Sequence, residues 1–178
     1  MTTAQQLIPT GTWNVDAVHS TAVFSVGHAA VGTFRGQFRK IDGGIADGLL
    51  RGEVTLDTLD VFDDNLKGHL LSPDFFDAER NPKLTFVTTD ARGHADSLIV
   101  EGDLTVRGVT KRVEAIGTIT GPLVLGEYGG TKLGIDLETV IDRTEFGLNW
   151  NAPLAGGNWM LEDEVTLSVH LELVPTDA

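Results

Sequence analysis

The sequence predicts an all-β protein in which about eight strands form an antiparallel sheet. Three observations lead to this fold class. Apolar and polar residues alternate over long stretches, the 21 glycines are spread between these stretches as breakers, and no helical pattern of roughly ten or more residues recurs between them. Parallel strands need such crossover helices, so the pattern favours antiparallel pairing.

The strands are expected at these positions, in chain order: near 11–17 with 19–30, 34–47, 51–60, 83–91, 96–108, 110–124, 131–147 and 163–175. Several exceed the usual length of about five or six residues, and long strands with glycine at bends favour a closed barrel. A two-sheet sandwich fits the alternation as well, so both architectures remain open at this point. A barrel of about eight strands either fills with side chains or holds one small ligand.

The inward face of each strand follows from an alternation of period two. The last strand is the clearest, because Val165, Leu167, Val169, Leu171 and Leu173 all fall on one face. Earlier strands place these groups together: Ala22, Phe24, Val26 and His28; Val54, Leu56 and Thr58; Leu98, Val100, Leu104 and Val106; Leu133, Ile135 and Leu137. The stretches 96–108 and 110–124 are expected to form a hairpin around "GVTK".

One segment, "DNLKGHLLSPDFFDAERNPKLTF", interrupts the strands. Asp63 or Asp64 suits the cap of a short helix, and Ser72-Pro73 suits a second helical start. Leu70, Leu71, Phe75 and Phe76 then form a short plug over an open end of the barrel. The plug either seals a filled core or acts as a lid over a cavity, and the pattern alone favours neither.

Composition limits the function classes. The 178 residues fit one domain, which we place at 11–178 after a flexible N-terminal segment at 1–10. The absence of cysteine excludes thiolate metal sites. The net charge of −13 argues against binding of nucleic acid and against stable adhesion to an anionic membrane. Contact with membranes is therefore expected to be transient. Without a recognisable signal peptide the expected compartment is the cytoplasm, with a periplasmic or secreted location as the alternative.

Asp16, His19 and Ser20 suggest a catalytic triad, but their spacing argues against it. His19 and Ser20 are adjacent on a strand, so their side chains point to opposite faces and cannot act together. We expect a structural hydrogen-bonding cluster and no catalytic residues. Histidines at 19 and 28 also fall on opposite faces, so no metal site is expected.

Three further features are assigned structural roles. His28 shares a face with Phe24 and Val26 and is expected to be a core residue with one hydrogen-bond partner. Asp142 and Arg143 are adjacent and cannot pair face to face, so each is expected to find a partner elsewhere and to hold its strand to a neighbour, with contact to a ligand headgroup as the alternative. Trp150 and Trp159 flank "NAPLAGGN", which is expected to be a loop at one end of the barrel that forms a rim.

Four motifs in order resemble the YceI-like, polyisoprenoid-binding family: "WNVDAVHSTAVFSVGHAAVGTFRGQF", "HLLSPDFFDAERNPKLTF", "VEGDLTVRGVTKRV" and "IDRTEFGLNW". The resemblance runs from about residue 12 to 174. It implies an eight-stranded antiparallel lipocalin-like β-barrel with a short helical insert, an apolar pore that holds a long isoprenoid chain, and a binding protein rather than an enzyme. The chain departs from the family pattern at Lys67 and Gly68, where Arg-Asp is usual.

We therefore expect the protein to bind, store or transport a polyisoprenoid or an isoprenoid quinone, with no cofactor. The alternative is a filled barrel that acts as a protein-interaction or stress-related module without ligand. The more polar outer faces are expected to meet solvent or a second subunit in a homodimer. The expected ligand-binding residues are Phe24, Val26, Leu56, Phe86, Leu104, Val106, Ile119, Leu137, Val169 and Leu171, with Leu70, Phe75 and Phe76 as the lid.

Overall fold

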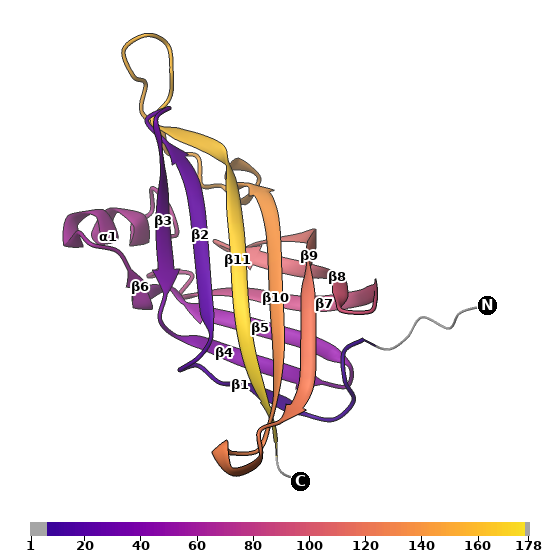
Figure 1. Ribbon diagram of the computed structural model, residues 1–178. Helices are drawn as coiled ribbons and strands as arrows, with labels where there is room; N and C mark the ends of the chain where they lie inside the picture. Colours follow the sequence, from indigo (N-terminus) through magenta and orange to yellow (C-terminus); the bar gives the residue numbers. More distant parts are fainter. Residues whose placement is uncertain (1–6, 177–178) are drawn as a thin grey trace.

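The computed structural model describes residues 7–176 as a closed antiparallel β-barrel with one short helix (Figure 1). The predicted all-β class and eight-stranded barrel are confirmed. The sheet has 11 strand segments, and three consecutive pairs of them, β1 with β2, β3 with β4 and β5 with β6, are two parts of one barrel strand. Each pair is interrupted only by a short bend or a 3-10 turn, and counting each pair once gives eight strands.

The elements follow one another in this order: β1 Trp13–Val15, β2 Thr21–His28, β3 Gly32–Phe38, β4 Ile41–Ala46, β5 Leu49–Thr55, η1 Leu56–Thr58, β6 Leu59–Asp60, α1 Asp64–Leu71, β7 Lys83–His94, β8 Ser97–Val106, β9 Val109–Val124, η2 Gly126–Tyr128, β10 Thr131–Asp142, η3 Arg143–Phe146 and β11 Leu161–Pro175.

The hydrogen-bonded ladders join into a ring. Consecutive strands pair from β4 through β5, β7, β8, β9 and β10 to β11, all antiparallel. Segment β1 closes the ring, because Trp13 lies opposite both Ile45 of β4 and Pro175 of β11. Segment β2 extends the same strand and pairs with β11 on one side and β3 on the other. Closure removes the sheet edges that an open sandwich would expose.

Two predicted strands are divided by bends. The stretch 34–47 breaks between β3 and β4, where the backbone N–H of Arg39 donates to the carbonyl of Thr58 at 3.1 Å and that of Lys40 donates to the Thr58 hydroxyl at 3.0 Å. The stretch 51–60 breaks at η1, which starts with the buried Leu56. Both bends turn the strands around a corner of the barrel, which alternation of side chains does not reveal.

Two further boundaries differ from prediction. The stretch 131–147 ends as a strand at Asp142, whose carboxylate accepts the N–H of Thr144 and thereby starts η3. The β8–β9 hairpin turns at Arg107 and Gly108, with φ values of 51° and 75°, so that of "GVTK" only its first residue lies in the turn. Positive φ at both central residues matches the twist of the flanking strands, so this turn sets the register of the hairpin.

The interruption between β6 and β7 contains the expected helix. Asp63 caps α1 by accepting the N–H of Leu66 at 2.8 Å. Ser72, predicted to start a second helix, instead ends the first, because its N–H donates back to the carbonyl of His69. Residues after it form hydrogen-bonded turns, in which the N–H of Phe76 donates to the carbonyl of Leu70 at 3.0 Å. In Figure 1 the helix lies beside β3 and β6, outside the ring of strands.

One end of the barrel, which we call the closed end, is filled by side chains. Ile45, Leu98, Leu133, Ile135 and Leu173 are each at most 1% exposed there. Ile8, within the segment predicted to be flexible, is 2% exposed and belongs to the same core. The core therefore begins before the predicted boundary at residue 11, while residues 1–6 lie outside the described part.

Within residues 7–176, none of the helices has the length and apolar character needed to cross a membrane.

Candidate functional site

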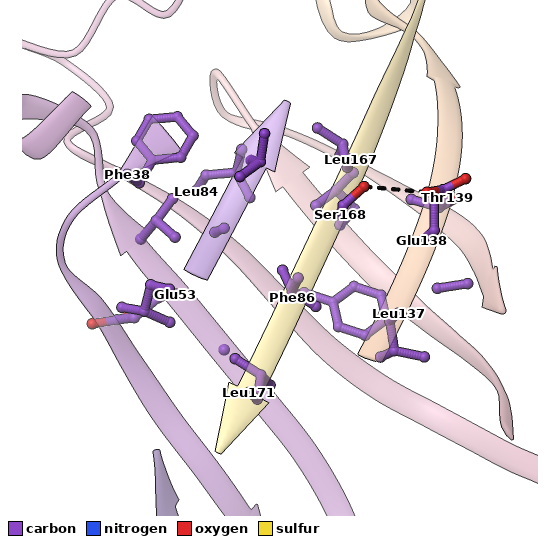
Figure 2. Close-up of a pocket in the computed structure, with 18 of the residues that line it drawn as sticks. Phe38, Glu53, Leu84, Phe86, Leu137, Glu138, Thr139, Leu167, Ser168 and Leu171 are labelled. Carbon is purple, nitrogen blue, oxygen red and sulfur yellow. Dashed lines mark hydrogen bonds between the residues drawn. The ribbon is translucent and has the colours of Figure 1, made fainter. Parts of the chain in front are cut away.

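Two apolar cavities lie inside the barrel beyond the closed end. The first, the central cavity, has a volume of about 120 Å³. Figure 2 shows Phe38, Leu84, Leu167 and Leu171 around it. Its walls come from most strands of the barrel: Ala22, Val23, Phe38, Ile41, Leu50, Gly52, Glu53, Val54, Leu84, Phe86, Leu104, Val113, Ala115, Leu137, Glu138, Thr139, Leu167, Ser168, Val169 and Leu171.

The second cavity, the mouth cavity, has a volume of about 260 Å³ and lies toward the opposite end, which we call the mouth. It is enclosed by β2, β3, β11, the helical insert and the segment after η3. Its walls are Phe24, Val26, His28, Phe34, Phe38, Leu66, His69, Leu70, Phe75, Phe76, Leu84, Val106, Ile141, Arg143, Leu148, Trp150, Met160, Leu161, Val165 and Leu167. Aliphatic and aromatic side chains dominate both cavities, which therefore suit an apolar ligand.

A partition of three side chains separates the cavities. Phe38, Leu84 and Leu167 line both of them. The Phe38 ring belongs to an aromatic cluster, with its centroid 5.8 Å from that of Phe24 and 6.1 Å from that of Phe76. The two cavities therefore adjoin at these three side chains.

The helical insert closes over the mouth cavity and is anchored to the β8–β9 turn. The Arg107 guanidinium donates to the carbonyls of Pro73 and Phe75, each at 2.5 Å. This turn follows "VEGDLTV" directly, so the hairpin fixes the part of the insert that follows α1. The anchor uses backbone carbonyls and does not need an ion pair at Lys67 and Gly68.

An aromatic contact ties the insert to the segment after η3. The His69 ring lies edge-on to Trp150, with centroids 4.8 Å apart, and edge-on to Phe75 at 5.0 Å. His69 Nε2 also lies 3.0 Å from a carboxylate oxygen of Asp74. The insert is thus held at a second point, and these three rings line the mouth cavity.

Arg143 is the most buried charged side chain of the mouth cavity, at 4% exposure. Its guanidinium donates to the carbonyls of Glu162 at 2.8 Å, Leu148 at 2.6 Å and Trp150 at 2.9 Å. Burial lowers its pKa, and the carboxylates of Asp163 and Asp142 oppose that effect. Arg143 therefore holds the segment 147–150 against β11.

Asp142 does not pair with the adjacent Arg143 and instead caps the turn that follows, in line with the expectation that the two residues have different partners. Its carboxylate accepts the hydroxyl of Thr144 at 2.6 Å and the backbone N–H of the same residue at 2.9 Å. These hydrogen bonds lower the pKa of Asp142 and cap η3.

Asp16, His19 and Ser20 lie at the closed end, away from both cavities. His19 Nδ1 and Lys132 Nζ lie 2.9 Å and 3.0 Å from the Asp16 carboxylate, and these hydrogen bonds lower the pKa of Asp16 from 3.8 to about 2. The Ser20 hydroxyl accepts the backbone N–H of Glu172 at 3.0 Å. The cluster joins the β1–β2 strand to β10 and β11, which is a structural arrangement.

The same cluster contains three groups that could reach one metal ion, on Asp16, His19 and Glu172. Lys132 Nζ already lies within 3.0 Å of both carboxylates. Its ammonium balances their charge, so the electrostatic attraction for a cation is reduced. That the protein uses no metal stays a prediction.

Most of the residues expected to bind ligand do line a cavity, although their contact with a ligand stays a prediction. Phe86, Leu104, Leu137, Val169 and Leu171 line the central cavity. Phe24, Val26, Leu70, Phe75, Phe76 and Val106 line the mouth cavity.

Two of the residues expected to bind ligand are buried but line neither cavity, and one residue expected in the core is exposed. Leu56 lines neither cavity, because the chain leaves the ladder at η1 and packs this side chain into the filled core at 1% exposure. Ile119 lies opposite Ile135 near the closed end, where side chains fill the interior. His28, expected in the core, is exposed, because β2 ends there at the mouth.

Several lining residues were not expected from the sequence. Phe38 and Leu84 belong to the partition. Leu84 shares the strand parity of Phe86, which was assigned inward, so alternation could have identified it, whereas no residue of the stretch 34–47 that contains Phe38 was assigned inward. His69, Trp150 and Met160 come from the insert and the loop before β11. No periodic pattern marks such residues, because their position depends on how irregular segments fold back over the barrel.

Beside the central cavity, the neighbouring strands β9 and β10 are paired over only part of their length. The β9–β10 ladder ends at the pair of Ile116 and Glu138. In contrast, β9 stays paired with β8 back to Val109, and β10 stays paired with β11 up to Asp142. Within the described residues, a side-chain hydrogen bond crosses this gap, from the Thr139 hydroxyl to the carbonyl of Glu114 at 2.7 Å.

Comparison with known proteins places this geometry in context. The family model for the YceI-like domain matches residues 13–173. A UPF0312 protein of Staphylococcus epidermidis is 32% identical over 171 residues, covering 90% of this chain and 95% of the relative. A UPF0312 protein of Staphylococcus aureus is 30% identical over 168 residues, covering 88% and 94%.

Solved structures with lower identity share the fold. BcnA of Burkholderia cenocepacia superposes with a TM-score of 0.71 at 21% identity, covering 89% of this chain and 98% of BcnA. A polyisoprenoid-binding domain from Saccharophagus degradans, implicated in plant cell wall breakdown, superposes with a TM-score of 0.73 at 16% identity, covering 92% and 98%.

Proposed function

The chain belongs to the YceI-like family, and from this premise we propose that its barrel binds a long-chain apolar lipid, a polyisoprenoid or an isoprenoid quinone, and stores or carries it. The similar domain from Saccharophagus degradans is described as polyisoprenoid-binding. The proposed role is binding without catalysis. In support, the Ser20 hydroxyl is engaged by the backbone of Glu172 rather than by a general base.

The observation that carries the proposal is the pair of adjoining apolar cavities that share Phe38, Leu84 and Leu167. An isoprenoid tail has no charge and almost no hydrogen-bonding groups, so shape and apolar burial must provide its recognition. A run of two cavities along the barrel suits a linear chain better than a compact ligand.

The energetics favour a reversible carrier. Each five-carbon unit contributes a few kcal/mol before costs, at about 0.8 kcal/mol per buried CH₂. Roughly eight such units would pass the practical affinity limit of about 18–21 kcal/mol. The entropic cost of ordering a flexible chain must therefore offset a large part of the free energy of apolar burial. Tight but reversible holding is the expected result, which suits storage or transfer.

The ligand must enlarge the cavities that it enters. The volumes of about 120 Å³ and 260 Å³ are small beside the roughly 300–1,000 Å³ typical of ligand sites. The partition side chains are the natural elements to move, because Phe38 can turn without loss of a backbone hydrogen bond. Binding is then expected to be slower than diffusion, since the competent conformation must form first.

Mass spectrometry of an organic extract of the natively purified protein tests the proposal. A stoichiometric long-chain isoprenoid is the expected result. The delipidated protein should then rebind such a lipid, presented in detergent, in a native-mass titration. If neither experiment detects bound lipid, the proposal fails and a protein-interaction module without ligand becomes the better account.

A further inference from the structure

An uncharged segment lies at the mouth of an otherwise strongly acidic protein. From Phe146 to Leu161 the sequence contains no charged residue, although the chain has a net charge of −13 and 22% of its residues are charged. The part from Trp150 to Met160, which we call the mouth loop, projects beyond the ends of β2 and β11 at the top of Figure 1. A solvated loop on such a protein would ordinarily carry charge, so the neutral composition needs a cause.

The mouth loop is ordered by its own hydrogen bonds. The N–H of Met160 donates to the carbonyl of Ala152 at 2.8 Å, and that of Leu154 donates to the carbonyl of Asn158 at 2.7 Å. At the base of the loop, the Asn151 amide donates to the carbonyl of Leu161 at 2.8 Å. Because the loop is already folded, it presents a fixed surface to a partner.

Two large apolar side chains are exposed on this surface, beside uncharged polar ones such as Asn158. Trp159 is 59% exposed on the mouth loop. Val31 is 91% exposed on the β2–β3 turn. A hydrogen bond joins the two segments, from the N–H of Ala29 to the carbonyl of Met160 at 2.7 Å. Tryptophan on an uncharged projection is typical of side chains that settle at the membrane–water interface.

The apolar surface continues into the mouth cavity. Trp150 and Met160, at the two ends of the mouth loop, both line that cavity, as does the exposed His28 beside the β2–β3 turn. A partner that covers Trp159 and Val31 would therefore face the cavity directly.

We propose that the mouth loop and the β2–β3 turn dock on the surface of an electrically neutral lipid bilayer, so that the mouth cavity opens against the phase in which long apolar lipids dissolve. This inference rests on the proposed function. The acidic residues Glu145, Glu162 and Asp163 flank the uncharged segment. They disfavour an anionic surface, so zwitterionic lipid is the occupant that the charges allow.

The opposite end of the barrel provides a matched comparison. The β9–β10 tip also exposes apolar side chains, with Val124 at 74% and Tyr128 at 87%. Behind that tip lies the filled closed end, with Leu133 and Ile135 at 1% and 0% exposure. Docking there would bring no cavity to the bilayer, so this tip is expected to be irrelevant to lipid uptake.

Docking is measured by mixing the protein with phosphatidylcholine vesicles whose acyl chains carry bromine, which quenches nearby tryptophan. Trp13 is 7% exposed at the closed end and Trp150 is half-buried in the cavity wall, so quenching should report chiefly on Trp159 and should fall sharply in Trp159→Phe. Val31→Asp should reduce the apparent vesicle affinity at least tenfold, whereas Val124→Asp should match the wild type. Equal effects of the two valine variants, no quenching of the wild type, or quenching that requires anionic lipid would overturn the proposal.

Lipid uptake separates this inference from the proposed function. A fluorescent polyprenol is offered either in phosphatidylcholine vesicles or in detergent micelles. Val31→Asp should take it up at least tenfold more slowly from vesicles and at the wild-type rate from micelles. If the wild type takes up lipid from micelles and Val31→Asp takes it up from vesicles at the wild-type rate, the docking proposal is wrong and the proposed lipid binding stands. If the wild type takes up lipid from neither source, the proposed function itself fails, and docking with it.

Discussion

Single side chains decide whether the interior is two cavities or one channel. Phe38 is 4% exposed, lines both cavities and packs against Phe24 and Phe76. At this scale the ligand competes with the protein's own aromatic rings for the same space. The balance between stability and capacity is therefore set by a few residues that could be changed one at a time.

Phe38→Ala should join the cavities and increase lipid capacity while it lowers stability. Loss of a buried phenylalanine costs about 3–5 kcal/mol, part of which comes from the space left behind. A bound lipid that fills this space should restore some of the loss. Urea unfolding of the delipidated and loaded variant measures both effects. Equal destabilisation with and without lipid would contradict the role of Phe38 as a partition.

The Asp16 cluster makes stability depend on pH in a defined direction. The folded-state pKa of Asp16 is about 2, below its ordinary value of 3.8. Its contribution of about 2 kcal/mol is therefore complete above pH 4 and is lost as the pH falls toward 2. Asp16→Asn should be less stable than the wild type by that amount at pH 7, and the gap should close near pH 2. Chemical unfolding across this range is the test, and a gap independent of pH would refute it.

At the scale of elements, the helical insert is both a wall and a cover. Its aromatic residues are buried like a core, yet they line the mouth cavity, and Arg107 holds them through two carbonyls. Burial alone does not distinguish a lid from a core, so the distinction needs a ligand-dependent measurement.

Phe75→Ala and Phe76→Ala, made singly, should release bound lipid at least several-fold faster. Each should also cost about 3 kcal/mol or more of stability, as for other buried phenylalanines. Phe146→Ala is the matched control, because Phe146 is 1% exposed but lines neither cavity. Similar destabilisation in all three variants, with unchanged release, would show that the insert is core rather than lid.

The elements also show what the sequence could predict. Alternation identified β8 and β11 and the inward set from Val165 to Leu171, because a regular strand repeats one choice of face many times. It missed the bends at Arg39 and Leu56, where two hydrogen bonds to Thr58 and a 3-10 turn, respectively, redirect the chain. His69 and Trp150 were not predicted as lining residues for a related reason, since their contact joins two irregular segments far apart in the sequence.

For the whole molecule, the main distinction is between a roomy barrel and a filled one. The structure combines both, with a filled closed end and a hollow mouth. The sequence predicted a barrel with apolar inward faces, but it could not divide its length into these two parts. Aliphatic residues of the same types line the closed end and the hollow part. The two parts differ in whether side chains from opposite walls of the barrel come close enough to fill the space between them.

Val169→Glu and Ser20→Ala test this division together. Val169 lines the central cavity, so a carboxylate there needs water, and the variant should fold but lose lipid. Ser20 lies in the cluster at the closed end, and its loss should leave lipid binding near the wild-type level. Circular dichroism and extracted lipid per protein are compared for the two variants. Full lipid content in Val169→Glu, or loss of binding in a folded Ser20→Ala, would reopen the case for an enzyme.

The parted strands β9 and β10 give the barrel a seam. A ring of fully paired strands has a fixed girth, because widening it breaks backbone hydrogen bonds all along one ladder. Here the ladder already ends at Ile116 and Glu138, and a hydrogen bond from the Thr139 hydroxyl spans the seam beyond it. The hollow part can therefore expand at the cost of that bond, while the closed end keeps its circumference.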